Sequence, residues 1–204
     1  MKARTLRSDT LAPWGEIVPD AGLMTVEGLL RWAGDESRRY EVVEGVLVRV
    51  AGSSPKAVRV TMRLLRVLDA HVEDHRLGQV TPPDAVYDFE RTGQPNTGLL
   101  PDIGFYYVHR EALVLDDQPY PFAPDLAVEI ASPSQKQEDL DAKARRYLAG
   151  GTSLVWVVWP DARAVDVWRA ADRLRPSKTL GVGDMLDGED VVGGFTYPIA
   201  GLFR

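Results

Sequence analysis

The chain has 204 residues, of which 45% are hydrophobic and 26% are charged, with a formal net charge of -6. This balance predicts a globular protein of one domain and argues against one whose whole surface binds nucleic acid, although it allows a local basic groove. Because there is no cysteine, disulfides, thiolate nucleophiles, iron–sulfur clusters and most structural zinc sites are excluded. The sequence has no apolar segment typical of a signal peptide or a membrane span, so we expect a cytoplasmic protein without membrane contact.

The first part of the chain predicts an irregular arm followed by a short helix. Residues 1–22 carry prolines and glycines typical of irregular structure, and we interpret them as an N-terminal arm. Residues 23–204 are expected to form the single domain. Thr25 is a suitable N-cap for a helix that Gly34 would end.

A hairpin and a long helix are predicted next. Residues 40–50 are rich in β-branched side chains, and Glu44-Gly45 within them predicts a tight turn. The sequence Ser53-Ser54-Pro55 then marks the beginning of a helix that runs to Arg76, because apolar residues recur there at helical spacing.

Strands predominate in the rest of the chain, and residues 183–190 are rich in turn-forming residues. We predict strands at 79–89, 102–108, 124–131, 153–159 and 164–170, a loop at 91–98 and a helix at 138–149. A clear strand–helix–strand unit occurs only at 124–159. We therefore expect an α/β fold in which helices flank a mixed β-sheet with β-hairpins, rather than a doubly wound parallel sheet.

Two acidic residues lie inside apolar segments that are predicted to be strands. Asp102 begins the strand after Pro101, and Glu129 has Val128 and Ile130 as neighbours. Carboxylates are rarely buried unless they are paired or bind a metal. On neighbouring strands, two such groups could hold one magnesium ion through oxygen ligands. The alternative is that each acid forms a structural salt bridge.

Lys143 is a third candidate, on the helix that follows the Glu129 strand. Tyr147 lies four residues later and therefore on the same helical face. A lysine that reaches back over the strand end could orient a water molecule or offset charge on a phosphate. The alternative is a solvated lysine, because Arg145 and Arg146 make this helix highly charged.

Five segments occur in an order that is typical of one protein family. They are RYEVVEGVL (39–47), LLPDIGFYYV (99–108), APDLAVEIASPS (123–134), DLDAKARRYLAGG (139–151) and LVWVVWPDARAVDVWR (154–169). Over nearly all of residues 24–204, the chain resembles the bacterial restriction endonucleases of the Uma type, which belong to the PD-(D/E)XK nuclease superfamily. The resemblance implies a restriction-endonuclease-like fold and cleavage of DNA with Mg²⁺ or Mn²⁺.

The resemblance also implies roles for individual residues. Asp102 matches the first metal-binding aspartate of the superfamily, and Glu129 matches the acid of its (D/E)-x-K element. Position 131 is alanine, so the lysine two positions after the acid is missing, and the family pattern places it on the next helix as Lys143. The backbone carbonyl of Ile130 would be a further metal ligand.

Other family positions are expected to support the site. Glu41 matches a glutamate near the hairpin that would complete it, while Asp125 matches a second Pro-Asp pair for which we favour a structural role. Loop and helix-capping roles are expected for Ser132, Ser134 and Asp139. The chain departs from the family at Lys56-Ala57, where a histidine is common, and at Trp159, where an aspartate is common.

Some patterns favour structural roles. His71 and His75 have a spacing that can bind zinc, but no third histidine and no cysteine lies nearby in sequence. Arg59, Arg63 and Arg66 form a stripe that could contact phosphates or simply be a solvated helix face. We expect the tryptophans of the later strands to fill the core or an interface.

The leading hypothesis is a magnesium- or manganese-dependent endonuclease that acts on DNA, with Asp102, Glu129, Lys143 and Glu41 as catalytic residues. The alternative is a degenerate relative that binds nucleic acid or protein on the same scaffold. A homodimer, whose sheet or tryptophan-rich region mediates the contact, is a further possibility.

Overall fold

A five-stranded antiparallel sheet forms one part of the computed structural model, which describes residues 11–19, 21–32 and 39–204. Its order is β1-β3-β2-β6-β5, and the strands are β1 (Gly15–Ile17), β2 (Arg39–Val43), β3 (Val46–Val50), β5 (Tyr87–Asp88) and β6 (Gly98–Leu99). The predicted hairpin is confirmed as β2 and β3. Its turn requires positive φ at Glu44 (53°) and Gly45 (81°), which glycine adopts without steric cost.

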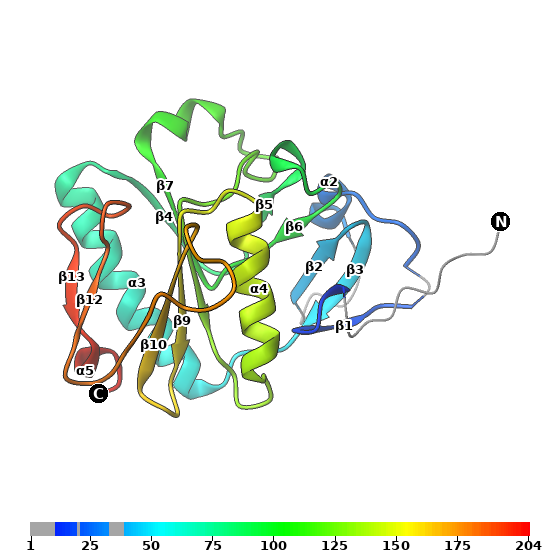
Figure 1. Cartoon of the computed structure of the whole chain (residues 1–204). Coiled ribbons are helices and arrows are strands. Elements are labelled where there is room, and N and C mark those ends of the chain that lie inside the picture. Colours follow the sequence, from blue (N-terminus) through cyan, green and yellow to red (C-terminus); the bar gives the residue numbers. More distant parts are fainter. Residues whose placement is uncertain (1–10, 20, 33–38) are drawn as a thin grey trace.

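A six-stranded mixed sheet forms the other part (Figure 1). Its order is β11-β10-β9-β8-β7-β4, and the strands are β4 (Gly78–Thr81), β7 (Ile103–Tyr107), β8 (Leu126–Ile130), β9 (Leu154–Trp159), β10 (Ala164–Arg169) and β11 (Lys178–Leu180). Only β8 and β9 pair in parallel, and α4 (Gln137–Ala149) connects them. The predicted mixed α/β fold is confirmed.

Two helices pack on opposite faces of this sheet. The long helix α3 (Pro55–His75) begins at the N-cap Ser54 and buries an apolar stripe against one face. Helix α4 packs on the other face and lies between the two sheets (Figure 1). The remaining elements are α2 (Val26–Leu30), η1 (Glu90–Thr92), η2 (Val108–Leu113), β12 (Met185–Asp187), β13 (Thr196–Pro198) and α5 (Ile199–Leu202).

Three predictions about elements are wrong in detail. The single strand at 79–89 is two short strands, β4 and β5, which belong to different sheets. The loop at 91–98 ends in β6 and begins within η1. The arm is not irregular throughout, because β1 pairs with β3. The predicted helix end at Gly34 lies outside the described residues.

Strand alternation decides which face of β8 carries chemistry. Leu126, Val128 and Ile130 belong to the core against α3, and the alternate residue Ala127 belongs to the core against α4. Glu129 therefore points toward α4 and the five-stranded sheet. Among residues 11–19, 21–32 and 39–204, no helix combines the length and hydrophobicity that crossing a bilayer requires.

Candidate active site

Asp102 and Glu129 meet because β7 and β8 pair side by side. The register aligns Ile103 with Val128, and the Asp102 N–H donates to the Val128 carbonyl at 2.9 Å. The Ile130 N–H donates to Asp102 Oδ2 at 2.8 Å. Both carboxylates are buried. Sequence reasoning predicted this convergence, and the strand pairing produces it.

Lys143 joins the two sheets. Its Nζ lies 2.9 Å from Glu129 Oε1 and 2.8 Å from Glu41 Oε1. One helical turn later, the Tyr147 hydroxyl donates to Glu129 Oε1 at 2.8 Å. The Lys143 side chain is 4% exposed, so it is not a solvated lysine.

Glu41 reaches the site from β2 and is fully buried. Its Oε1 accepts from the Leu100 N–H at 2.9 Å, and its Oε2 accepts from Trp14 Nε1 at 2.7 Å. Trp14 was missed by sequence reasoning because it falls in the segment interpreted as an arm. No local pattern around it signals a partner 27 residues away.

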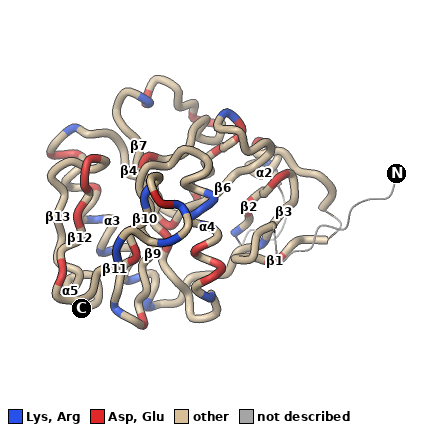
Figure 2. The backbone as a smooth tube through the Cα atoms, viewed as in Figure 1, with Lys and Arg blue, Asp and Glu red and all other residues tan. Residues whose placement is uncertain are grey.

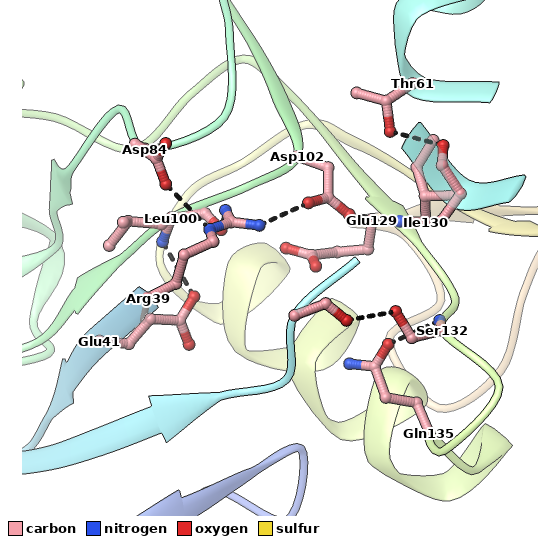
Figure 3. A network of polar contacts seen from close by, with 12 residues as sticks. Arg39, Glu41, Thr61, Asp84, Leu100, Asp102, Glu129, Ile130, Ser132 and Gln135 are labelled. Carbon is pink, nitrogen blue, oxygen red and sulfur yellow. Dashed lines mark hydrogen bonds and ion pairs between the residues drawn. The ribbon is translucent and has the colours of Figure 1, made fainter. Parts of the chain in front are cut away.

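Arg39 is the second residue that was missed, and Figure 3 shows it between Asp84 and Asp102. Its Nη1 lies 2.8 Å from Asp102 Oδ1, and its Nε lies 3.0 Å from Asp84 Oδ1. A signal was present in the sequence: Arg39 and Glu41 are two residues apart on a strand and therefore share a face.

The buried cluster contains more negative than positive side chains. Glu41, Asp102 and Glu129 contribute three carboxylates, while Arg39 and Lys143 contribute two cations. Burial raises the pKa of Glu129 to about 7. The positive charge of Lys143 lowers this pKa, whereas the negative charges of Asp102 and Glu41 raise it further. Burial lowers the pKa of Lys143, but Glu129 and Glu41 outweigh it, so the pKa is raised and the amine is cationic.

The comparisons with known proteins concern the family and the fold. Residues 26–200 match the sequence family described as "Uma2: Putative restriction endonuclease". The chain belongs to the Uma2 family. A crystal structure of "a putative nuclease belonging to DUF820" from Anabaena variabilis resembles it with a TM-score of 0.71 and 20% identity, over 88% of this chain and 97% of that one. That likeness shows a shared fold. The search of curated proteins finds no match.

Three of the residues expected to support the site have hydrogen-bond or ion-pair partners. Asp125 Oδ1 lies 2.9 Å from Arg110 Nη2, and its Oδ2 accepts from the Tyr107 N–H at 3.0 Å. Ser132 donates to the Gly52 carbonyl at 3.2 Å. Asp139 accepts from the Lys136 N–H at 3.2 Å and thereby caps α4.

Trp159 and Lys56, where the resemblance predicted other residues, both have polar partners. Trp159 Nε1 donates to Asp166 Oδ2 at 2.7 Å, and Lys56 Nζ lies 2.6 Å from Asp161 Oδ1. His71 contacts the Gly193 carbonyl at 3.0 Å. In the described part of the chain, no three His, Asp or Glu side chains are grouped as a metal site, so neither the histidine pair nor the acids Glu41, Asp102 and Glu129 provide three side-chain ligands for one ion.

A cavity of about 20 Å³ lies at the two carboxylates, with Asp102, Glu129, Ile130 and Lys143 among its lining residues. This is room for one water molecule or one small cation. Carboxylate and carbonyl oxygens are the ligands that hard divalent cations prefer, and the excess of buried negative charge favours a cation. The donor set therefore fits magnesium or manganese.

Proposed function

We propose that this chain is a magnesium-dependent nuclease that hydrolyses phosphodiester bonds in DNA, with manganese as the alternative cation. One observation carries the proposal: Lys143 bridges acids of two different sheets beside Asp102, in a buried cluster of a Uma2-family chain. Hydrolysis adds water to the phosphorus atom and breaks one P–O bond, which leaves a phosphate monoester and a hydroxyl group.

Asp102, Glu129 and the Ile130 carbonyl would hold the cation. When bound, it would polarise the phosphoryl group and lower the pKa of water. Asp102 must exchange its contact with Arg39 for this role, because its second oxygen accepts from the Ile130 N–H. Glu129 keeps Oε1 for Lys143 and Tyr147 and offers Oε2 to the cation.

Lys143 is a charge-stabilising residue rather than a base in this proposal. Its raised pKa keeps the amine protonated at neutral pH, so it can donate to a phosphate oxygen or orient the attacking water. Glu41 holds the amine from the opposite side at 2.8 Å. The Trp14 indole and the Leu100 N–H in turn hold Glu41, so the lysine has a fixed direction.

A calorimetric titration with Mg²⁺ or Mn²⁺ tests the cation assignment. Wild type and Asp117→Asn, an exposed control with the same charge change, are expected to bind equally. Asp102→Asn should lose at least the roughly tenfold affinity that even outer-shell changes cost in metal sites. Equal binding by Asp102→Asn, or no binding by wild type, would overturn the assignment.

Cleavage of plasmid and of single-stranded DNA then tests the activity. Wild type and Asp117→Asn should cut one or both substrates when Mg²⁺ or Mn²⁺ is present and not in EDTA. Asp102→Asn and Lys143→Met should be inactive. Metal-independent cutting, or cutting that is undiminished in Asp102→Asn, contradicts the proposal.

A second candidate function is supported by the hydrogen bonds of Asp102. Both of its oxygens already have protein partners, Arg39 and the Ile130 N–H, so the cluster is satisfied without a cation. Such a chain would bind nucleic acid or protein without cutting it. Absence of both calorimetric heat and cleavage, with DNA binding retained, would favour this alternative.

A further inference from the structure

A basic hollow lies at the beginning of α3. Its volume is about 380 Å³, and the beginning of α3, the β9–β10 turn and the C-terminal residues line it. Its basic side chains are Lys56, Arg59, Arg63, Arg163 and Arg204. Asp161 is the acidic residue among the described residues that line it. Figure 2 shows basic positions gathered with an acidic one at the lower end of the view, where these segments meet.

Two of these side chains have protein contacts that hold them in place. Lys56 pairs with Asp161 across the hollow at 2.6 Å, and both side chains are largely exposed, at 48% and 75%. Arg63 donates to the Leu202 carbonyl at 3.1 Å, which leaves the rest of its guanidinium available. Exposed pairs are weak, so a phosphate can replace Asp161 at little cost.

The arginines at the rim are exposed, and no described carboxylate forms an ion pair with Arg59 or Arg163. Lys56, Arg59 and Arg63 recur at spacings of three and four residues, so they follow one face of α3. Arg163 faces them from the β9–β10 turn, where it adopts a positive φ of 53°. Such a concentration of positive charge is unusual in a chain with a net charge of -6.

The lining of the hollow and the lining of the active-site cavity both include residues of the short stretch of chain at the beginning of α3. Ser53 lines the cavity and Lys56 lines the hollow, so their Cα atoms are no more than about 11 Å apart. A nucleic-acid strand advances roughly 3.4 Å along a duplex axis per phosphate. A strand with one phosphate at Asp102 that continues along residues 53–56 would therefore place a phosphate a few nucleotides away at Lys56 of the hollow.

We propose that this hollow binds the phosphate backbone of the DNA strand that enters the active site. The inference rests on the proposed function for its substrate, but it concerns binding rather than cleavage. Phosphate contacts fix the position of a strand without reading its sequence. The acidic remainder of the surface would repel the backbone and restrict binding to this region.

Fluorescence anisotropy with a short labelled DNA duplex, in EDTA and over a range of NaCl concentrations, tests the inference. The variant is Arg59→Ala/Arg163→Ala. The control is Arg91→Ala/Arg173→Ala, which removes the same charge from exposed positions that do not line the hollow. All three proteins should unfold at the same temperature, because the replaced side chains are exposed.

The Arg59→Ala/Arg163→Ala variant, here called the groove variant because it alters the hollow, should bind DNA with a Kd about tenfold higher at low salt. The slope of log Kd against log[NaCl] should fall by about two, because each lost phosphate contact lowers it by roughly 0.9. The control should match wild type. Equal Kd and slope in the groove variant, an equal loss in the control, or no DNA binding by wild type would overturn the inference.

Failure of the inference can be distinguished from failure of the proposed function. If wild type cuts DNA while the groove variant binds normally, only the hollow is wrongly assigned. If the groove variant loses binding while wild type cuts nothing with either cation, the hollow stands and the nuclease proposal fails.

Discussion

At the scale of single residues, the candidate site depends on side chains whose neighbours in sequence look ordinary. Lys143 stands near Arg145 and Arg146, and only the resemblance to the Uma family distinguished it from them. The helical pattern contained a second signal: Leu140, Ala144 and Tyr147 are buried, and Lys143 lies between them on that face. Reading a helix by its faces could therefore have predicted the burial of this lysine.

Removal of the lysine charge should destabilise the fold. Lys143→Met leaves Glu41 and Glu129 buried without their cation, and breaking a buried ion pair in this way costs about 3–5 kcal/mol. The double variant Lys143→Met/Glu41→Gln should lose less, because one carboxylate charge is removed with the amine. Urea denaturation measures the free energy of unfolding of both variants. A single variant as stable as wild type would contradict the ion-pair argument.

The raised pKa of Glu129 predicts how stability depends on pH without metal. The pKa of about 7 in the folded chain exceeds the ordinary 4.5, so the folded state retains a proton that the unfolded state releases. This group should therefore make the free energy of unfolding fall as pH rises from about 4.5 to about 7. Denaturation of wild type and Glu129→Gln in EDTA across this range isolates the effect. An unchanged difference between the two proteins would show that Glu129 does not titrate there.

At the scale of elements, periodicity predicted what local sequence determines, and tertiary pairing determined the rest. The β-branched residues and turn signal of residues 40–50, the alternation in residues 164–170 and the apolar stripe of α3 were sufficient to predict these elements. The segment 79–89 divides because β4 pairs with β7, whereas β5 pairs with β6. No pattern within the segment specifies those partners.

Because Lys143 reaches the site from helix α4, an insertion that changes the phase of this helix should disrupt the site. One alanine inserted between Asp141 and Ala142 would rotate the following side chains by about 100° and move Lys143 away from Glu129. One glycine inserted between the exposed Pro133 and Ser134 would lengthen a loop and leave the helix in register. Thermal unfolding should show a large loss for the first insertion and a small one for the second. Similar losses of thermal stability in the two variants would argue against the idea that the helical phase of α4 positions Lys143.

At the scale of the whole molecule, the site forms where two sheets and one helix meet. The sequence predicted a mixed sheet and placed both acids at or in apolar strands, which are β7 and β8. It did not predict the edge strand β11, which is short and largely exposed. It did not predict that β1 would join the hairpin sheet and bring Trp14 to Glu41. Pairing with β3, which places Gly15 opposite Val50, depends on contacts distant in sequence and therefore has no local signature.

Trp14→Phe should lower the free energy of unfolding, because it removes this long-range contact. The change keeps an aromatic ring and removes the N–H that donates to buried Glu41, and an unsatisfied buried group costs about 1–3 kcal/mol. The control Trp32→Phe makes the same change at a half-buried tryptophan whose indole N–H has no hydrogen-bond partner among the described residues. Chemical denaturation should separate the two variants. Equal stabilities would mean that the indole hydrogen bond contributes nothing measurable.

The homodimer stays a prediction, but it loses one of its supports. Trp156 and Trp168 are fully buried, so they fill the core as expected and cannot form an interface between copies. A dimer would need another surface. Sedimentation velocity at several protein concentrations should give the mass of two chains if the prediction is correct, and the mass of one chain would refute it.

The hydrogen bond from Trp14 to Glu41 shows that the part of the chain that matches the family and the part that builds the site do not begin at the same residue. Similarity to the Uma2 family begins at residue 26, whereas the group that holds Glu41 lies earlier in the chain. A fragment cut to the limits of the family would keep every residue that the resemblance names. It would nevertheless leave the Oε2 oxygen of Glu41 without its donor. Anyone who trims the chain to its recognisable portion would therefore be studying an altered site.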